Sequence, residues 1–316
     1  MQHALICQSD SVPCYAIAMK EKKPLPRLDN PYRPRGSWYK GAFHFHSTGS
    51  DGMLSPRASI QKYASSGFKV IGLSDHGRVT PVDPAWFPGV LLIPTAEIGW
   101  PHLLHIGAKK AGKIDLPAFK EAIAHAHREK SFTVLCHPDW SNHTWKELDK
   151  AAPQVFALEL YNHVTEIENA TGLARETWDM LLRAGHRLWG FADDDAHFRV
   201  SQPQYGGGWV MIRTPRLTRD AVIKSLKTGS YYSSQGPRLF DLTIKGRFIH
   251  LRCSPVVEVR AVASGIGAGM CFFSKKPRGS WVLDRSRFQW PETTYVRIEL
   301  KDAKGKVAWL NPLFKA

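Results

Sequence analysis

The most informative residues of this 316-residue chain are histidines and aspartates that recur in three short motifs. The motifs are an HxH pair followed by an aspartate, an aspartate–histidine step and a DxH pair, formed by His44, His46, Asp51, Asp75, His76, Asp195 and His197. Imidazole and carboxylate groups are ligands that zinc, manganese and iron ions accept. One such pair carries little information. Three of them in this order, each after an apolar run typical of a strand, predict a site for divalent metal ions.

The segment between residues 41 and 236 alternates between patterns typical of strands and patterns typical of helices. Short apolar runs predict strands at 41–47, 68–74, 90–98, 103–108, 132–136, 155–160, 187–191 and 208–212. Amphipathic spacing and capping signals predict helices at 56–66, 117–130, 165–184 and 217–227. Repeated strand–helix units imply a mostly parallel sheet, either open or closed into a barrel.

The metal-capable side chains fall at one end of these predicted strands. His44 and His46 are two residues apart on a strand, so both project from the same face. Further carboxylates and imidazoles follow the later strands: Asp75, His76, Glu97, His137, Glu159, Asp195 and His197. Because functional side chains of parallel α/β folds collect at the carboxyl ends of the strands, we expect these residues to converge.

Each of these residues also has an ordinary structural explanation. Asp51 precedes Gly52 in a pair typical of turns, and residues 193–195 fit a solvated turn or the start of a helix. His102 and His105 alternate on one strand, so at most one of them should reach the site. Surface or cap positions suit the histidines that lie elsewhere: His3, His125, His127, His143, His186 and His250. Taken singly these explanations suffice, but they do not account for the ordered set.

The two ends of the chain differ from this middle region. Residues 1–36 are rich in proline, arginine and lysine, which predicts an extended N-terminal arm because proline breaks helices and is excluded from central strands. Residues 37–236 form the predicted metal-binding domain. After residue 236, apolar runs alternate with turn signals and no helix pattern is convincing, which predicts a small antiparallel or sandwich-like β-rich domain at 237–316.

Composition narrows the class of protein. The net charge of +15 favours an anionic small-molecule substrate, but the basic residues are spread along the chain, so we do not expect nucleic-acid binding. No run of eighteen apolar residues predicts a membrane span, and the first 20 residues do not resemble a secretory signal. Five scattered cysteines fit a reduced cytoplasm. The oligomeric state is left open.

The ordered motifs resemble the polymerase-and-histidinol-phosphatase (PHP) superfamily. The resemblance covers about 195 residues and rests on the segments FHFHS at 43–47, SDG at 50–52, IGLSDH at 71–76, TAE at 95–97, LCHP at 135–138 and DAH at 195–197. Within the superfamily the chain is most similar to the branch of carbaryl-type hydrolases. That similarity rests on ELYN at 159–162, GSYYSS at 229–234, GP at 236–237 and the β-rich tail with AWLNP at 308–312.

This resemblance implies a distorted (β/α)7 TIM-like barrel with two or three divalent ions, of zinc, manganese or iron, at its mouth. The implied ligands form three groups: His44, His46, Glu97 and Asp195; Glu97, His102 and His137; and Asp51, His76 and His197. Some family members have a histidine in place of Asp51, which leaves the third ion open. His105 and the other two aspartates are alternatives to His102 and Asp195, which are chosen for their spacing to Gly107 and His197.

Metal ions lower the pKa of bound water from near 16 to about 7, which provides a nucleophile at neutral pH. Asp75, His76 and His197 are candidates to supply or relay a proton. The candidates for substrate contacts are Arg78, Arg199, Asn162 and His105. Arginine suits a phosphate group, although both arginines fit plain surface positions equally well.

Three classes of function compete. The first is a metal-dependent phosphoesterase acting on a small molecule, which is the commonest chemistry of the superfamily. The second is a hydrolase of carboxyl esters, carbamates or amides with the same metal cluster, as the branch resemblance suggests. An apolar pocket would favour it, and Trp86, Phe87, Trp100, Trp140, Trp145 and Trp209 are candidates to line one. The third is a scaffold without catalysis, which the full set of ligands disfavours.

Overall fold

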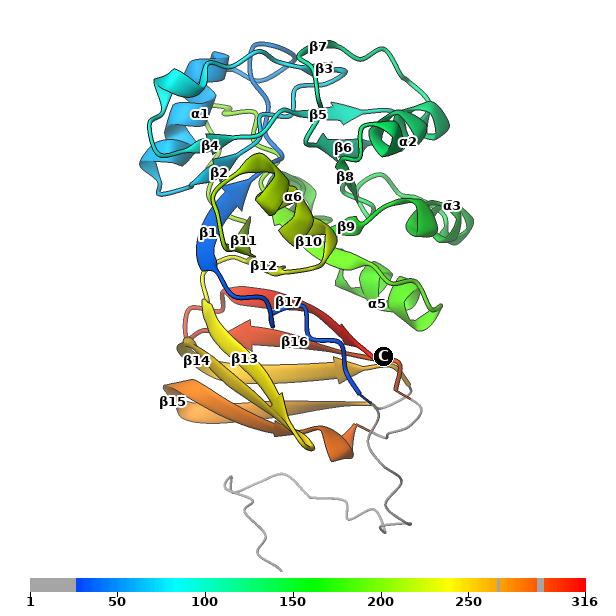
Figure 1. Cartoon of the computed structure of the whole chain (residues 1–316), viewed down its shortest axis with the longest axis vertical. Coiled ribbons are helices and arrows are strands. Elements are labelled where there is room, and N and C mark those ends of the chain that lie inside the picture. The colour runs from blue at the N-terminus through cyan, green and yellow to red at the C-terminus, as the bar shows by residue number, and fades with distance from the viewer. Residues whose placement is uncertain (1–26, 266–267, 289–292) are drawn as a thin grey trace, which may run out of the picture.

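Figure 1 shows the computed structural model of the chain, which describes residues 27–265, 268–288 and 293–316. Residues 1–26 of the expected N-terminal arm lie outside this description. The rest of the arm is attached to the C-terminal strands, because Leu28 forms a β-bridge with Lys315. The buried Tyr32 hydroxyl donates to the carbonyl of Tyr231 at 3.2 Å and accepts from the backbone amide of Asn311 at 2.6 Å.

The larger of two main sheets has ten strands and runs through most of the molecule. In spatial order it contains β13 (Leu239–Lys245), β14 (Phe248–Ala263), β16 (Tyr295–Lys301), β17 (Val307–Phe314), β12 (Tyr231–Ser234), β11 (Trp209–Thr214), β1 (Ser37–Ala42), β2 (Val70–Ile71) and β4 (Leu91–Leu92), while β15 (Gly269–Asp284) pairs with β14. Only β1, β2 and β4 pair in parallel in this sheet. The other pairs are antiparallel.

The second main sheet has five strands: β10 (Trp189–Asp193), β9 (Ala157–Asn162), β8 (Phe132–Leu135), β6 (Leu103–Ile106) and β5 (Thr95–Ile98), in that order. A two-stranded pair of β3 (Arg78–Val79) and β7 (Gly112–Lys113) lies beside it. The α-helices of the described residues are α1 (Pro56–Ser65), α2 (Phe119–Arg128), α3 (Trp145–Ala151), α4 (His163–Asn169), α5 (Arg175–Arg183) and α6 (Arg219–Lys227).

An apolar core fills the space between the two sheets. Phe43, Phe132, Phe191 and Val210 are completely buried in one cluster that takes residues from both sheets and from α6. Phe43 directly precedes the first histidine of the HxH motif. Burying four such side chains contributes about 1.5–3 kcal/mol each, so the core anchors the backbone on which the candidate site is built.

Two predicted elements are divided in the structure. The predicted strand 90–98 is split by Pro94 into β4, which pairs with β2, and β5, which pairs with β6, so this segment passes from one sheet to the other. The predicted helix 165–184 is split into α4 and α5. Ala170 adopts a left-handed conformation with φ of 56°, which ends α4, and Leu173 then forms a bridge with Tyr161.

The α/β class is confirmed, but the pairing does not show the expected (β/α)7 barrel. Strand β6 runs antiparallel to both β5 and β8, and β11 runs antiparallel to β1, so the sheets are mixed rather than mostly parallel. A barrel built from βα units requires parallel neighbours, whereas β5 and β6 form an antiparallel pair joined by a short direct connection.

The C-terminal region is β-rich, as its sequence pattern predicts. Strands β14 and β15 form a long hairpin, where the sequence suggested several short strands. The sheet of this region continues into the rest of the molecule, because β17 pairs with β12 through Leu310, Trp309 and Ala308. Figure 1 shows these strands as a layer below the helical part of the chain.

A buried ionic network also ties the C-terminal strands to α5. Arg297 of β16 is 2% exposed and donates to both oxygens of Asp179 in α5 at 2.6 Å, and it also donates to Glu299. Burial disfavours the charged guanidinium, but the hydrogen bonds and charges of these two carboxylates outweigh it and raise the pKa of Arg297. A bidentate arginine–carboxylate pair fixes the relative position of two elements.

Candidate metal centre

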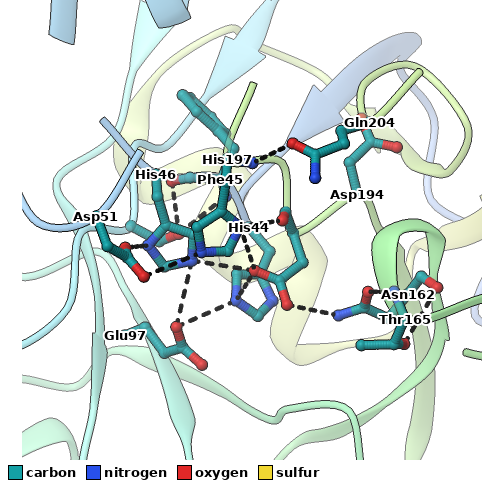
Figure 2. Close-up of polar contacts among 12 residues, drawn as sticks. His44, Phe45, His46, Asp51, Glu97, Asn162, Thr165, Asp194, His197 and Gln204 are labelled. Atoms are coloured by element: carbon teal, nitrogen blue, oxygen red, sulfur yellow. Dashed lines mark hydrogen bonds and ion pairs between the residues drawn. The ribbon is translucent and has the colours of Figure 1, made fainter. Parts of the chain in front are cut away.

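The two main sheets meet at one edge, where the three sequence motifs come together. Phe45 forms a parallel bridge with Ala196, and His76 forms a parallel bridge with Glu97. Backbone hydrogen bonds from Asp195 to His44 at 2.8 Å and from His46 to Ala196 at 2.9 Å extend β1 toward the end of β10. Residues more than 140 positions apart in the chain are therefore neighbours, as Figure 2 shows.

The first group of candidate ligands surrounds the centre of this edge. His44 Nε2 lies 3.2 Å from Asp195 Oδ1 and 3.3 Å from Glu97 Oε2. His46 Nε2 lies 3.1 Å and 3.4 Å from the same two oxygens. All four side chains are nearly or completely buried. Two imidazoles and two carboxylates with converging lone pairs are a donor set suited to a divalent cation.

The second group shares Glu97 with the first. Glu97 Oε1 lies 2.8 Å from His102 Nδ1 and 3.2 Å from His137 Nε2. Its other oxygen faces His44 and His46. The Glu97 carboxylate therefore stands between two sets of histidines, in the position of a bridging ligand.

The third group lies on the outer side of His46. His197 Nε2 is 3.2 Å from Asp51 Oδ2, and His76 Nε2 is 3.6 Å from the same oxygen. The His46 ring stacks between those of His76 and His197, with centroids 4.4 Å away on each side. His76 also reaches Glu97 through Nδ1 at 3.1 Å. The three groups thus form one continuous cluster.

The donor atoms of the cluster are better suited to binding metal ions than to hydrogen bonding with one another. His44 Nε2 and Glu97 Oε2 are buried, and neither makes a hydrogen bond within the described part of the chain. An unpaired polar atom in a buried place costs free energy unless an absent partner satisfies it. Donor atoms of His44, His46 and Asp195 lie within 4.8 Å of one another, as do those of His46, Asp51, His76 and His197, which is compatible with shared ions.

The acid–base state of the histidines follows from the surrounding carboxylates. Burial alone would lower the pKa of His44, but Asp195, Glu159 and Glu97 raise it well above its usual value. The pKa values of His137 and His197 are likewise raised against the effect of burial, by Glu97 for the first and Asp51 for the second. The surrounding carboxylates therefore favour the protonated form of these three rings, whereas burial lowers the pKa of His76.

A second layer of hydrogen bonds orients the candidate ligands. Glu159 Oε1 lies 2.8 Å from His44 Nδ1, which leaves Nε2 directed into the cluster. Glu159 Oε2 accepts from the backbone amide of His137 at 2.6 Å and from Asn162 Nδ2 at 3.1 Å. Asn162 also donates to Asp195 Oδ2 at 3.1 Å, so it contacts two carboxylates of the centre. These contacts give Asn162 a supporting position, where the sequence suggested a substrate contact.

The three consecutive aspartates have separate roles in the structure. Asp193 accepts from the backbone amide of Phe43 at 2.8 Å. Asp194 accepts from Tyr63 and from the amides of residues 206–208. Asp195 alone among them lies against His44 and His46, and its φ of 58° turns the chain at this point. Asp195 is the aspartate that the spacing to His197 predicts as a ligand.

Asp75 lies beside the cluster with its carboxylate bonded to a loop. It accepts from the backbone amide and hydroxyl of Ser47 at 2.7 Å each, from the Ser50 hydroxyl at 3.0 Å and from the Thr80 hydroxyl. Both of its oxygens are used in this way. The geometry makes Asp75 a support for the segment that carries Asp51, where the sequence suggested proton transfer.

Three further candidates are directed elsewhere. Arg78 Nη1 donates to the carbonyl of Gly49 at 3.3 Å, and the exposed Arg199 pairs with Glu168 at 3.0 Å. His105 contacts Ser131 at 2.7 Å and Glu129 at 3.2 Å. It points away from His102, as strand alternation predicts.

Two residues near the centre are not among the predicted ligands. The sequence places Glu159 at the end of a predicted strand with the other metal-capable side chains but assigns it no role. Cys136, which precedes His137, offers its sulfur within 4.8 Å of atoms of His44, Glu97 and His137. Burial and the nearby carboxylates raise the pKa of the Cys136 thiol well above its usual value. Cys136 lies within the LCHP segment at 135–138, from which only His137 is predicted as a ligand.

Comparisons with known proteins connect this fold to solved structures. A two-domain protein from Bacteroides vulgatus ATCC 8482, described as containing a predicted PHP-like metal-dependent phosphoesterase, is 16% identical with a TM-score of 0.52, and the match covers 90% of this chain and 95% of that one. This similarity shows a shared fold across both the helical and the C-terminal β-rich parts. No family model and no curated protein sequence matches the chain.

Two other structures align with a smaller part of the chain. PsfC from Pseudomonas syringae PB-5123 is 15% identical over 60% of this chain and 87% of its own, with a TM-score of 0.42. An amidohydrolase from Chromobacterium violaceum, with bound sulfate and no metal, is 12% identical over 59% of this chain and 95% of its own, also with a TM-score of 0.42. In the described residues, no helix is long and apolar enough to cross a membrane.

Proposed function

We propose that this protein is a metal-dependent hydrolase of the PHP type that cleaves phosphoester bonds in a small molecule. The observation that carries the proposal is the Glu97 carboxylate, with one oxygen facing His44 and His46 and the other facing His102 and His137. A carboxylate in this position suits a site for two neighbouring ions. The likeness to the Bacteroides vulgatus structure supports the same assignment.

Two or three ions of zinc, manganese or iron bound here would lower the pKa of a water molecule and balance the charge that develops on the ester oxygens. The residues of the chain would hold the ions in three groups: His44, His46, Glu97 and Asp195; Glu97, His102 and His137; and Asp51, His76 and His197. Glu159 would keep His44 in the tautomer with a free Nε2. Among the histidines of the three groups, His76 has the most accessible side chain, at 37%, so it marks the side from which a substrate would approach.

The fold and the ligand groups also support more specific proposals. The two bridges that join the sheets at the centre are consistent with a strongly distorted barrel of the PHP type, with residues 37–236 as the hydrolase domain and 237–316 as a β-rich appendage. We further propose that the protein acts in the cytoplasm on an anionic small molecule. Membership of the carbaryl-type branch is a proposal supported by the sequence motifs alone.

One observation favours a second candidate function, the hydrolysis of neutral carboxyl esters, carbamates or amides. A cavity of about 200 Å³ opens beside Glu97, His76 and His102. Its remaining walls include Ile98, Ile114, Leu116 and Pro117 together with Asp115, and its described lining contains a second carboxylate but no lysine or arginine. Such a cavity suits an apolar group better than a doubly charged phosphate.

The decisive experiment combines metal analysis with a substrate panel. Protein purified without chelator and supplied with zinc, manganese or iron should contain two or three ions per chain, and Glu97→Gln should lose most of them. The loaded protein should hydrolyse para-nitrophenyl phosphate or bis-para-nitrophenyl phosphate. Activity on a naphthyl carbamate alone would select the second candidate, and less than one ion per chain would exclude both. Glu121→Gln, an exposed glutamate in α2, is the control for loss of a carboxylate.

A further inference from the structure

Two exposed tryptophans border the second ligand group. Trp100 and Trp140 have 52% and 44% of their surface accessible, although tryptophan is highly buried on average. Both lie close in the sequence to residues of the centre, because Trp100 comes just after β5 and Trp140 comes three residues after His137. Large exposed aromatic rings next to a polar centre are the kind of surface that a ligand covers.

Each tryptophan packs against one candidate ligand. The Trp100 and His102 ring centroids are 4.9 Å apart with an interplanar angle of 90°, and those of Trp140 and His137 are 4.8 Å apart at 81°. The two histidine rings are themselves 5.3 Å apart. In both contacts the rings meet edge to face, which leaves indole surface uncovered.

We infer that Trp100 and Trp140 form a platform for a planar aromatic group of the substrate, next to the bond that is cleaved. The inference rests on the proposed function and deepens it, since it specifies aryl esters over alkyl esters. His102 Nδ1 and His137 Nε2 both face Glu97 Oε1, and each of these two rings packs against one of the tryptophans. A substrate held by this ligand group would present its organic substituent to the indole rings.

The physical gain expected from this platform is moderate and measurable. Aromatic contacts stabilise a complex beyond the effect of the apolar area that they bury. The phenyl group should therefore increase affinity by about tenfold, which corresponds to about 1.4 kcal/mol. The contribution should depend on the rings of Trp100 and Trp140 and not on the charge of the ligand.

The test compares phenylphosphonate with methylphosphonate by calorimetric titration of the metal-loaded, full-length protein. The two ligands share the metal-binding phosphonate and differ in the ring. Phenylphosphonate should bind the natural protein about tenfold more tightly. Trp100→Ala and Trp140→Ala should each reduce this preference, and the double variant should abolish it while the affinity for methylphosphonate stays the same. Trp145→Ala, at an equally exposed tryptophan (42%) in α3, is the matched control.

Several results would overturn the platform. These are equal affinity of the natural protein for the two ligands, absence of phenylphosphonate binding, and an unchanged preference in the double variant. A change of molecular mass in solution on substitution would instead make the tryptophans an interface between copies of the chain. Trp100→Phe should retain part of the preference, which separates loss of the ring from misfolding. The metal content and hydrolysis assays above test the proposed function independently, because the phenyl preference is a binding property.

Discussion

Glu159 Oε1 lies 2.8 Å from His44 Nδ1, and the other oxygen of the same carboxylate accepts from the backbone amide of His137 at 2.6 Å. One buried side chain therefore fixes residues of two different ligand groups. Carboxylates in this position orient metal-binding histidines and increase their basicity. Glu159 therefore positions two candidate ligands without being a candidate ligand itself.

Replacement of Glu159 by glutamine should weaken metal binding by about 10–100-fold. The amide retains the shape of the side chain but removes the charge that holds the proton on His44 Nδ1. Competition with a chromophoric chelator measures the loss. Glu121→Gln in α2 should bind metal like the natural protein, and a similar affinity for Glu159→Gln would show that this contact does not support the centre.

The metal-free protein should lose stability as the pH rises from about 6.5, the usual pKa of histidine. His44, His137 and His197 have raised pKa values when folded, so their protonation stabilises the fold below the unfolded pKa. That contribution disappears as the pH rises through their folded pKa values. Urea unfolding at a series of pH values measures this trend.

Metal binding should show the opposite sign of pH dependence. Ligand histidines must be neutral, so binding expels protons and the affinity should increase with pH over the same range. Titrations in two buffers with different ionisation enthalpies count the released protons. A metal-free protein whose stability increases above neutral pH, or metal uptake without proton release, would contradict this account of the cluster.

Gly52→Ala should remove the ion of the third group and leave the other two groups intact. A Cβ atom on Gly52 would lie 2.5 Å from the carbonyl carbon and oxygen of His46, so the segment carrying Asp51 must move. Metal analysis should show about one ion fewer per chain wherever the natural protein holds three. Gly236→Ala is the control, because its nearest neighbour would be a side-chain carbon at 3.4 Å.

Asp179→Ala should destabilise the protein by about 3–5 kcal/mol without changing its metal affinity. The substitution leaves the guanidinium of Arg297, which is 2% exposed, without its bidentate partner. Denaturant unfolding measures the change. Asp29→Ala removes an exposed pair with Arg187, with an N–O distance of 3.0 Å, and should cost only about 0–1 kcal/mol. Equal effects of the two substitutions would show that the buried network has no special role.

The sequence allowed the convergence of these side chains to be predicted because its motifs depend on local rules. His44 and His46, on either side of the Phe45 bridge beyond β1, face the same carboxylates as alternation predicts, and the split between His102 and His105 follows the same rule. The order of the motifs along the chain placed them at successive strand ends. The contacts of Asp75 could not be predicted in this way, because its partners Ser47, Ser50 and Thr80 are common loop residues without distinctive spacing.

The arrangement of the sheets could not be predicted in the same way. Strands β2 and β4 have two residues each, and the apolar runs around them are longer than the paired segments. Pro94 transfers the chain between sheets, but a proline in an apolar run does not say where the next strand pairs. The helix split at Ala170 depends on a left-handed residue that is not glycine, which composition does not signal.

The pairing of β12 with β17 has a practical consequence for how the chain can be divided. Tyr232, Ser233 and Ser234 pair with the last strand of the chain, so a cut near Gly236 would leave the edge of β12 that faces β17 unpaired, while its other edge still pairs with β11. Unpaired strand edges of this kind pair with other chains and promote aggregation. Excising the centre as an independent fragment would therefore require a substitute strand or charged residues along β12.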